Sequence, residues 1–402
     1  MRRSSSPLTR LTAVVAGLVL AVAGAVTLAT PAQAASLTQV ANFGSNPGNL
    51  AMYAYRPDNL PSGAPAVVLL HGCTQNASAY FTNSGWRKYA DQWNFALIVA
   101  EQKSANNATS CFNWFETGDT ARGQGEALSI KQMVDHAKAN FGTDGGRVFV
   151  SGLSAGAAMS AVMLATYPDV FAAGSIVAGI PYRCATSMIN AFSCMNPGTD
   201  KSPAAWGDLV RNAYPGYSGP RPRVAIWHGT SDTTVAPLNA GEARDQWTNV
   251  RGVSQTPTST SSLPGGTSLE VYGNDAVRLY RVSGMGHGTP VDPGSGADQC
   301  GNAGAYFLDT ICSAYRDAIF FGLGAGGGDP TDPPPTDPPP TDPPTTPVCT
   351  TASNYAHVVA GRAYQSGGYA YANGSNQRMG LYNTFYTTTL KQTAPNYWVI
   401  GC

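Results

Sequence analysis

One serine in a glycine-flanked turn is the residue best suited to do chemistry in this chain. Residues 152–156 read Gly-Leu-Ser-Ala-Gly, which fits the G-x-S-x-G pattern around Ser154. The apolar residues before the turn predict a short strand, and the Ala/Met/Leu run after it predicts a buried helix. Such a turn exposes the serine Oγ and directs the Ala155 N–H at a developing oxyanion. The pattern predicts a nucleophile, and a turn that only packs is the alternative.

A nucleophilic serine needs a histidine base and an acid that orients the base. His287, in VSGMGHGTP, follows the last predicted strand and comes after the serine, as the chain order Ser, Asp/Glu, His requires. Asp232, in WHGTSDTTV, follows a buried strand, where its carboxylate could fix the histidine tautomer. We therefore predict the triad Ser154, Asp232 and His287. A loop histidine without function and a simple turn aspartate are the alternatives.

The segment AVVLLHGCTQN is predicted to supply a second oxyanion donor. Its strand ends at Leu70, so His71-Gly72-Cys73 forms the turn of the oxyanion hole, and the Cys73 N–H acts beside that of Ala155. His71 and His228 each precede a glycine at a strand end, where we expect them to shape a turn rather than to act as the base of Ser154. A reactive Cys73 thiol is the rival interpretation, and we discount it because a paired cysteine is already oxidised.

The elements that must position these residues alternate between strands and helices. This order predicts an α/β fold with a mostly parallel sheet covered on both faces, and a site at the carboxyl ends of the strands. The insertion Ile180–Arg221 is expected to form a wall or lid over the site. The predicted strands are Ala66–Leu70, Ala96–Ala100, Val148–Ser151, Gly174–Ala178, Val224–Trp227 and Val277–Val282, and the predicted helices are Gly125–Asn140, Ala155–Tyr167 and Tyr306–Phe321.

The composition divides the chain into four parts. Residues 1–34 have the basic start, apolar run and Ala-Gln-Ala end of a secretory signal peptide, with a retained membrane anchor as the weaker alternative. Residues 36–322 form a large domain, 323–348 a linker rich in glycine and then in Thr, Asp and Pro, and 349–402 a small domain. We expect a secreted, extracellular monomer with no membrane partner once the signal is cleaved.

The charge balance and the cysteine content indicate which classes of partner and which disulfides to expect. Residues 1–34 hold three arginines and no acid, so 21 of the 24 basic residues and all 24 acidic residues remain, a balance that speaks against nucleic acid. Eight cysteines suit an oxidising compartment and predict four disulfides. The sequence has no pair of C-x-x-C motifs, which would suggest zinc, and the serine chemistry predicted above needs neither a metal nor a cofactor. Although 105 connectivities are possible, nearest-neighbour closure predicts Cys73–Cys111, Cys184–Cys194, Cys300–Cys312 and Cys349–Cys402.

The small domain has nine aromatic residues, three basic residues and no acid. Alternation such as Tyr369/Tyr371 predicts short strands, so we expect a β-rich module closed by its disulfide. Many rigid rings outside a large core favour adsorption to a solid, and the alternative is that the rings form the core of the module. The predicted polymer-binding residues are Tyr355, His357, Arg362, Tyr369, Tyr371 and Trp398.

Taken together, the motifs HGCTQN, SCFNWF, ARGQGEALSI, GLSAG, HGTSDTTV and GMGHGTP resemble those of secreted polyhydroxybutyrate depolymerases, which belong to the same esterase group as feruloyl and acetylxylan esterases. The resemblance covers 36–322 and implies an α/β-hydrolase fold with Ser154, Asp232 and His287 as the triad and His71-Gly72-Cys73 as the oxyanion segment. The segments ASNYAHVVAGRA and GSNQRMGL resemble the substrate-binding domains of those depolymerases. No cofactor is implied.

Three functions follow from these observations. The first is a secreted serine esterase that cleaves a solid, insoluble poly(3-hydroxybutyrate)-type polyester. The second is a feruloyl or acetylxylan esterase whose tail binds plant-wall polysaccharide. The third is a polymer-binding protein whose hydrolase domain has lost its activity. The presence of every predicted triad residue argues against this third function.

Overall fold

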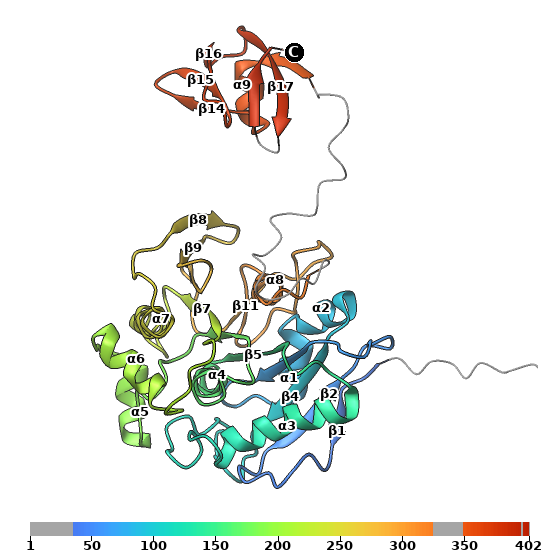
Figure 1. The fold of residues 1–402 in the computed structure, drawn as a ribbon, viewed down its shortest axis with the longest axis vertical. Helices are drawn as coiled ribbons and strands as arrows, with labels where there is room; N and C mark the ends of the chain where they lie inside the picture. The colour runs from blue at the N-terminus through green and yellow to red at the C-terminus, as the bar shows by residue number, and fades with distance from the viewer. Residues whose placement is uncertain (1–34, 325–348, 395–396, 402) are drawn as a thin grey trace, which may run out of the picture. The chain divides into compact units, whose positions relative to one another are not determined.

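The computed structural model describes residues 35–324, 349–394 and 397–401. The chain divides into two compact units, one ending at Pro333 and one beginning at Pro334 (Figure 1). The predicted signal peptide and all but the first two residues of the predicted linker lie outside the described residues. Within the described ranges, no helix is long and apolar enough to cross a membrane.

The first unit is built on one large sheet, which has ten strands among residues 35–324. In sheet order they are β1 (Thr38–Val40), β2 (Ala51–Tyr55), β4 (Ala96–Glu101), β3 (Ala66–Leu70), β5 (Val148–Leu153), β6 (Ala173–Val177), β7 (Arg223–Gly229), β10 (Val277–Val282), β9 (Thr267–Tyr272) and β8 (Ser259–Leu263). The six central strands, from β4 to β10, run parallel, and antiparallel strands extend both edges. The carboxyl ends of the parallel strands therefore share one edge.

Helices cover both faces of this sheet, which is why its central strands are apolar on both sides. Val68 and Ile98 face one core, whereas Val67 and Leu97 face the other. The first core is closed by α3 (Gly125–Phe141), α4 (Ala155–Thr166), α6 (Pro203–Arg211) and α7 (Leu238–Arg251). The second is closed by α1 (Ala77–Asn83), α2 (Trp86–Trp93) and α8 (Ser313–Phe320) (Figure 1).

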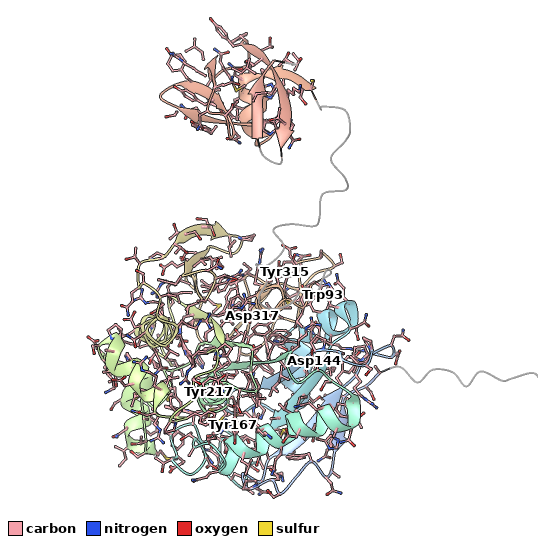
Figure 2. All side chains as sticks on the ribbon, in the orientation of Figure 1. Trp93, Asp144, Tyr167, Tyr217, Tyr315 and Asp317 are labelled. Carbon is pink, nitrogen blue, oxygen red and sulfur yellow. A yellow bond between two sulfur atoms is a disulfide. The ribbon has the colours of Figure 1, made fainter. Side chains whose placement is uncertain are left out.

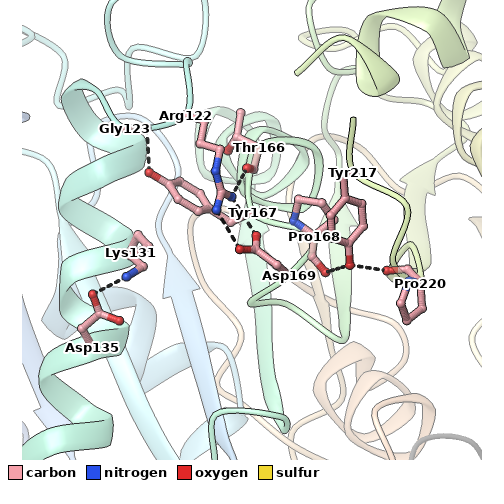
Figure 3. A network of polar contacts seen from close by, with 10 residues as sticks. All are labelled: Arg122, Gly123, Lys131, Asp135, Thr166, Tyr167, Pro168, Asp169, Tyr217 and Pro220. Carbon is pink, nitrogen blue, oxygen red and sulfur yellow. Dashed lines mark hydrogen bonds and ion pairs between the residues drawn. The ribbon is translucent and has the colours of Figure 1, made fainter. Parts of the chain in front are cut away.

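Helix α4, which follows the serine turn, is buried along its whole length and anchored at its far end. Arg122 Nη1 donates a hydrogen bond to the carbonyl oxygen of Thr166 at 2.7 Å, and its two terminal nitrogens bind the Asp169 carboxylate at 2.7 Å each (Figure 3). The Tyr167 hydroxyl accepts a hydrogen bond from Gly123 N at 2.9 Å. A bidentate charged pair is geometrically specific, so these bonds fix the helix whose other end carries the serine.

The sequence prediction of one helix over Tyr306–Phe321 is wrong in its first half. β12 (Phe307–Asp309) pairs in parallel with β11 (Thr289–Val291), and the helix begins only at Ser313. Pairing and the Cys300–Cys312 disulfide hold the first half outside the helix. The helix that remains carries Asp317, which is labelled in Figure 2. Its Oδ1 accepts a hydrogen bond from Trp227 Nε1 at 2.8 Å, which fixes the helix against the sheet.

Three of the four predicted disulfides are present among the described residues. They join Cys73 to Cys111, Cys184 to Cys194 and Cys300 to Cys312. The fourth predicted pair, Cys349–Cys402, includes a residue outside the described part of the chain and stays a prediction. Leu323, the first residue of the predicted linker, is buried in the same core as residues of α8.

The second unit is β-rich. Its described residues form two antiparallel sheets and one short helix, α9 (Asn354–Val359). One sheet is β13 (Cys349–Ser353), β17 (Thr387–Ala394) and β18 (Tyr397–Ile400), and the other is β14 (Ala363–Ser366), β15 (Tyr369–Ala372) and β16 (Arg378–Leu381). Its core is small and consists of Ala363, Ala370, Ala372, Met379, Leu390 and Trp398.

Candidate active site

Ser154 lies in the turn between β5 and α4, with φ at 56° and ψ at −117°. A positive φ is strained for a residue with a Cβ and persists only where the surrounding structure enforces it. A Cβ at Gly152 would lie 2.4 Å from the carbonyl oxygen of Gly156, and a Cβ at Gly156 would lie 2.2 Å from that of Leu70. The glycines of G-x-S-x-G are therefore required for strand and helix to approach around the serine.

The two other predicted triad residues are in direct contact. Asp232 follows β7, and His287 follows β10, at the same edge of the sheet as Ser154. The His287 Nδ1 donates to Asp232 Oδ2 at 2.7 Å, and the other carboxylate oxygen accepts hydrogen bonds from the Thr234 and Val235 N–H groups at 2.9 Å each. This pairing orients the ring and leaves Nε2 as its basic nitrogen.

Asp232 is held as a carboxylate. Burial raises its pKa, but the hydrogen bond from His287, the charge of that ring and the bond from the Val235 N–H outweigh burial, and the pKa lies below the ordinary value. An ionised carboxylate is what an imidazolium needs beside it during the reaction. A close fit between the two loops supports this contact, because a Cβ at Gly229 would lie 2.2 Å from the Met285 carbonyl oxygen.

His228 is a neighbour of the triad that the sequence analysis assigned only to a turn. Its side chain is fully buried, with Nε2 2.9 Å from the Val235 carbonyl oxygen and 3.5 Å from Asp232 Oδ2. The carbonyl fixes Nε2 as the protonated nitrogen, and burial lowers the pKa of the ring, so the residue is neutral. Its position four residues before Asp232 was the only sequence signal available.

The predicted oxyanion turn lies beside Ser154. The N–H of Gly72 donates to Gln75 Oε1 at 2.8 Å, and that of Thr74 donates to the Thr109 carbonyl oxygen at 2.7 Å. In the part of the chain that the structure describes, the Cys73 N–H between them has no such partner. The Ala155 N–H, in the first turn of α4, likewise lacks an intrahelical acceptor. Both Cys73 and Ala155 line the cavity that contains Ser154.

The side chain of His71, a residue of the predicted oxyanion segment, is held by backbone groups on both sides. The ring is completely buried, its Nδ1–H donates to the Gly72 carbonyl oxygen at 2.7 Å, and its Nε2 accepts from the Gln102 N–H at 3.1 Å. Burial lowers the pKa of His71 to about 4, so the ring is neutral. His71 therefore braces the turn from behind, because both ring nitrogens are engaged by backbone groups.

A buried carboxyl group supports the loop on the far side of that turn. Glu126 of α3 is hydrogen-bonded to the Gln102 side-chain amide, and its Oε2 accepts from the Asn113 N–H at 2.9 Å. Burial, with a contribution from Asp119, raises the pKa of Glu126 to about 8. The Gln102 Oε1 in turn accepts from Asn106 Nδ2 at 2.7 Å. Loop 102–116 is thereby pinned, and the Cys73–Cys111 disulfide joins it to the oxyanion turn.

Ser154 opens into a cavity of about 720 Å³. One wall is loop 106–116, and the opposite wall is α5 (Met188–Met195), which lies in the segment predicted to form a wall or lid. Among the described residues that line the cavity, Glu116 is the only charged one, and the apolar lining includes Trp114, Phe115, Ile180, Met188, Ala191, Phe192, Met195 and Val235. The arrangement favours a neutral, apolar acyl group next to the serine.

In the second unit, two predicted polymer-binding residues belong to the core instead. His357 is fully buried, with Nε2 2.8 Å from the Thr388 carbonyl oxygen and Nδ1 accepting from Arg362 Nε at 2.9 Å. Trp398 is also buried, in the small core of the unit. Arg362 is half-buried through its bond to His357. Of the other three, Tyr355 is exposed, and Tyr369 and Tyr371 are partly exposed.

The exposed rings of this unit form two groups, and the sequence analysis missed most of their members. On one face of the β14–β16 sheet, Tyr364 stacks on Tyr371 with centroids 5.4 Å apart, and Arg378 covers Tyr369 at 3.7 Å. The second group surrounds a turn in which Asn383 Oδ1 accepts the N–H groups of Phe385 and Tyr386 at 2.9 Å each. Phe385 is 89% exposed.

Within the described residues, no group of three or more His, Cys, Asp or Glu side chains is arranged to hold a metal ion.

Residues 50–271 match the family described as esterase PHB depolymerase. The chain is 57% identical to poly(3-hydroxyalkanoate) depolymerase C of Paucimonas lemoignei over 293 residues, which are 72% of this chain and 70% of that protein. It is 41% identical to an acetylxylan esterase of Coprinopsis cinerea over 264 residues, 64% of this chain and 70% of the relative. It is 38% identical to feruloyl esterase B of Talaromyces stipitatus, over 64% of this chain and 74% of the relative.

Among solved structures, an acetyl xylan esterase from Aspergillus awamori superposes with a TM-score of 0.62 at 30% identity, covering 72% of this chain and all of that one. This match agrees with the α/β-hydrolase fold that the sequence predicted. The family match extends over more than half of the chain, and it includes both the serine turn and Asp232. The chain therefore belongs to the esterase PHB depolymerase family and is a serine-type ester hydrolase.

Proposed function

We propose that this chain is a secreted esterase that hydrolyses ester bonds in a solid polyester of the poly(3-hydroxybutyrate) type. The observation that carries the proposal is the apolar cavity at Ser154, which suits a neutral aliphatic acyl chain. The similarity to a poly(3-hydroxyalkanoate) depolymerase exceeds that to the two plant-wall esterases, which favours a polyester over a polysaccharide ester. Disulfides in the catalytic unit support an extracellular site of action.

Acylation uses the three triad residues together. Ser154 Oγ attacks the ester carbonyl carbon while His287 Nε2 takes the hydroxyl proton, and Asp232 stabilises the imidazolium through Nδ1. The carbonyl oxygen becomes an oxyanion that accepts hydrogen bonds from the Cys73 and Ala155 N–H groups. When the tetrahedral intermediate collapses, the alkoxide leaves with the proton held by His287, and the acyl group stays on Ser154.

Deacylation reverses the roles with water as the nucleophile. His287 Nε2 removes a proton from water, the hydroxide attacks the acyl carbon, and the same two N–H groups hold the second oxyanion. Collapse breaks the bond to Oγ, and Ser154 recovers its proton from His287. The products are a shortened polymer or oligomer with a hydroxyl end and a fragment with a carboxylate end. No step requires a metal or an organic cofactor.

The second unit is proposed to hold the enzyme on the polymer. On the β14–β16 sheet, Ala363, Ala370, Ala372 and Met379 face the core of the unit, so the opposite face of the sheet carries Tyr364, Tyr369 and Tyr371 toward solvent. Rigid rings bury much area at low entropic cost, and the unit has no acidic residue among 349–402. A tether of this kind raises the local concentration of the catalytic unit without adding catalytic contacts.

Hydrolysis of acetylated or feruloylated xylan is the second candidate, supported by the acetyl xylan esterase fold and the two esterase relatives. One substrate comparison separates the candidates. Purified full-length chain is incubated with polyhydroxybutyrate granules, with acetylated xylan and with methyl ferulate, and a Ser154→Ala variant serves as the blank. We expect the granules to clear and 3-hydroxybutyrate and its oligomers to appear. Rapid release of acetate or ferulate with granules unchanged would assign the second candidate.

A further inference from the structure

Helix α5 has apolar side chains on both of its faces. Ala191 and Cys194 point inward and pack in the same apolar cluster as Trp114 and Val235. On the outside, Met188 is 52% exposed, Ile189 82% and Phe192 66%. A helix at the surface of a soluble protein ordinarily turns polar side chains to the solvent. We call Met188, Ile189 and Phe192 the α5 patch.

The three side chains of the α5 patch are neighbours. Met188 and Phe192 are four residues apart and Ile189 and Phe192 are three apart, so they lie side by side on one surface of the helix. No charged residue occurs between Cys184 and Thr199, the stretch that contains the helix. A contiguous exposed apolar surface without charge marks a site of contact with an apolar partner.

The patch is held rigidly. The Ser187 side chain caps the helix by accepting from the Asn190 N–H at 3.4 Å, and the Cys184–Cys194 disulfide fastens its last turn. The carbonyl oxygen of Met195 accepts from the Ala236 N–H at 2.8 Å, which ties the helix to the loop that follows Asp232. The apolar side chains are therefore presented to solvent by a fixed support rather than by a mobile segment.

The patch continues into the catalytic cavity. Met188 and Phe192 belong both to the patch and to the lining of the cavity at Ser154, whereas Ile189 lies outside that lining. A solid can deliver an ester to Ser154 only if it reaches the mouth of this cavity, where the patch forms the rim. The occupant that fits is thus the neutral, apolar surface of the polyester itself.

We infer that the α5 patch is a second polymer-docking site, carried by the catalytic unit, that seats the polyester surface beside the mouth of the cavity. This inference rests on the proposed polyester substrate. It assigns the two docking sites different roles. The tail keeps the enzyme on the solid, and the α5 patch places a polymer chain over Ser154 once the enzyme is there. Hydrolysis per adsorbed molecule should then depend on the patch, while hydrolysis of small soluble esters should not.

Ile189 provides the test because it is the most exposed member and does not line the cavity. Full-length Ile189→Asp is compared with wild type on polyhydroxybutyrate film, and the hydrolysis rate is divided by the amount of adsorbed enzyme. We expect about a tenfold loss, because a charge replaces an apolar contact, with turnover of p-nitrophenyl butyrate within about twofold of wild type. Ile189→Met should retain the wild-type rate. Thr260→Asp, on the exposed edge strand β8, is the matched control for adding a charge and should also retain it.

The remaining outcomes overturn the inference. An unchanged rate per adsorbed Ile189→Asp molecule would show that the patch does not act on the solid, and an equal loss on the soluble ester would place Ile189 in the catalytic fold. A wild-type dimer that Ile189→Asp converts to monomers, measured by light scattering, would make the patch a contact between copies of the chain. If wild type itself leaves the film intact while it hydrolyses the soluble ester, the proposed polyester substrate is wrong. That result comes from wild type alone and is therefore distinguishable from a failure of the patch variant.

Discussion

The two units of this chain differ in how much of their aromatic surface they bury. In the catalytic unit, Trp206, Trp227 and Trp247 are completely buried beneath the helices of a large sheet. In the tail, Phe385 is almost fully exposed, and Tyr355 and Tyr386 are exposed with it. A module of about fifty residues has too little interior to hide nine rings, since the buried fraction falls with size. The rings that remain outside are the ones available to touch a solid.

The units differ in their acidic residues as well. The catalytic unit buries Asp232, Glu126 and Asp317, and burial raises the pKa of Asp317 to about 7. Residues 349–402, which we call the tail, contain no acidic residue. Buried carboxyl groups position loops and a catalytic ring, whereas an acid-free surface has no carboxylate to desolvate when it adsorbs. The comparison predicts that changes in one unit affect turnover and changes in the other affect adsorption.

The largest effect is expected at the triad. Ser154→Ala and His287→Ala should each lower kcat/KM on p-nitrophenyl butyrate by roughly 10⁴- to 10⁶-fold, because triad members act as a unit. Adsorption to polyhydroxybutyrate granules, measured by depletion from solution, should stay at the wild-type level. The kcat/KM of Asp232→Asn should fall nearly as far, because His287 would lose the correct tautomer. Near-normal turnover in that variant would mean that another acid orients His287.

A smaller effect, confined to adsorption, is expected from the exposed rings of the tail. Tyr364→Ala combined with Tyr371→Ala should weaken granule binding about tenfold, and Phe385→Ala about threefold, because each ring loses buried area against the solid. Turnover of the soluble ester should not change. Thr384→Ala, next to Phe385, is the control and should bind normally. Unchanged binding in both ring variants would remove the adsorption role from these two surfaces.

Replacing His228 should slow turnover modestly. His228→Leu keeps the volume but removes the Nε2–H that lies against Val235 and Asp232, so we expect kcat to fall about fivefold with little change in KM. His228→Gln restores a donor near that position and should recover part of the rate. The measurement is kcat as a function of pH on a soluble ester. Equal kcat in both variants and wild type would limit His228 to packing.

The smallest effect is a change in the pH dependence of stability. The folded-state pKa of Glu126, about 8, exceeds its ordinary value, so the folded protein keeps a proton that the unfolded chain releases. Its contribution is complete below about pH 4.5 and is lost as the pH rises toward 8. Glu126→Gln cannot titrate, so it provides the reference. The Tm of wild type should fall relative to the Tm of the variant as the pH rises over that interval. Parallel Tm curves would contradict the assignment.

The sequence predicted the catalytic site better than the tail because their constraints differ in range. The glycines around Ser154 are dictated by sterics within a few residues, and the parallel strands by their own apolar runs. Burial of His357 and Trp398 depends on strands that meet only in the folded module, so composition could not separate core rings from surface rings. The predicted helix start at Tyr306 is wrong for a similar reason, because the pairing of β12 with β11 is a tertiary contact that local sequence does not show.

Division of labour between the units is the central claim, and truncation tests it most directly. The cut belongs after Gly324 rather than Gly322, because Leu323 completes the core of the catalytic unit. We predict that the truncated enzyme keeps its kcat/KM on p-nitrophenyl butyrate within about twofold but loses most binding to, and hydrolysis of, polyhydroxybutyrate film, by roughly 10²-fold. Equal losses on the soluble ester and on the film would contradict the account, because the tail would then belong to the catalytic fold.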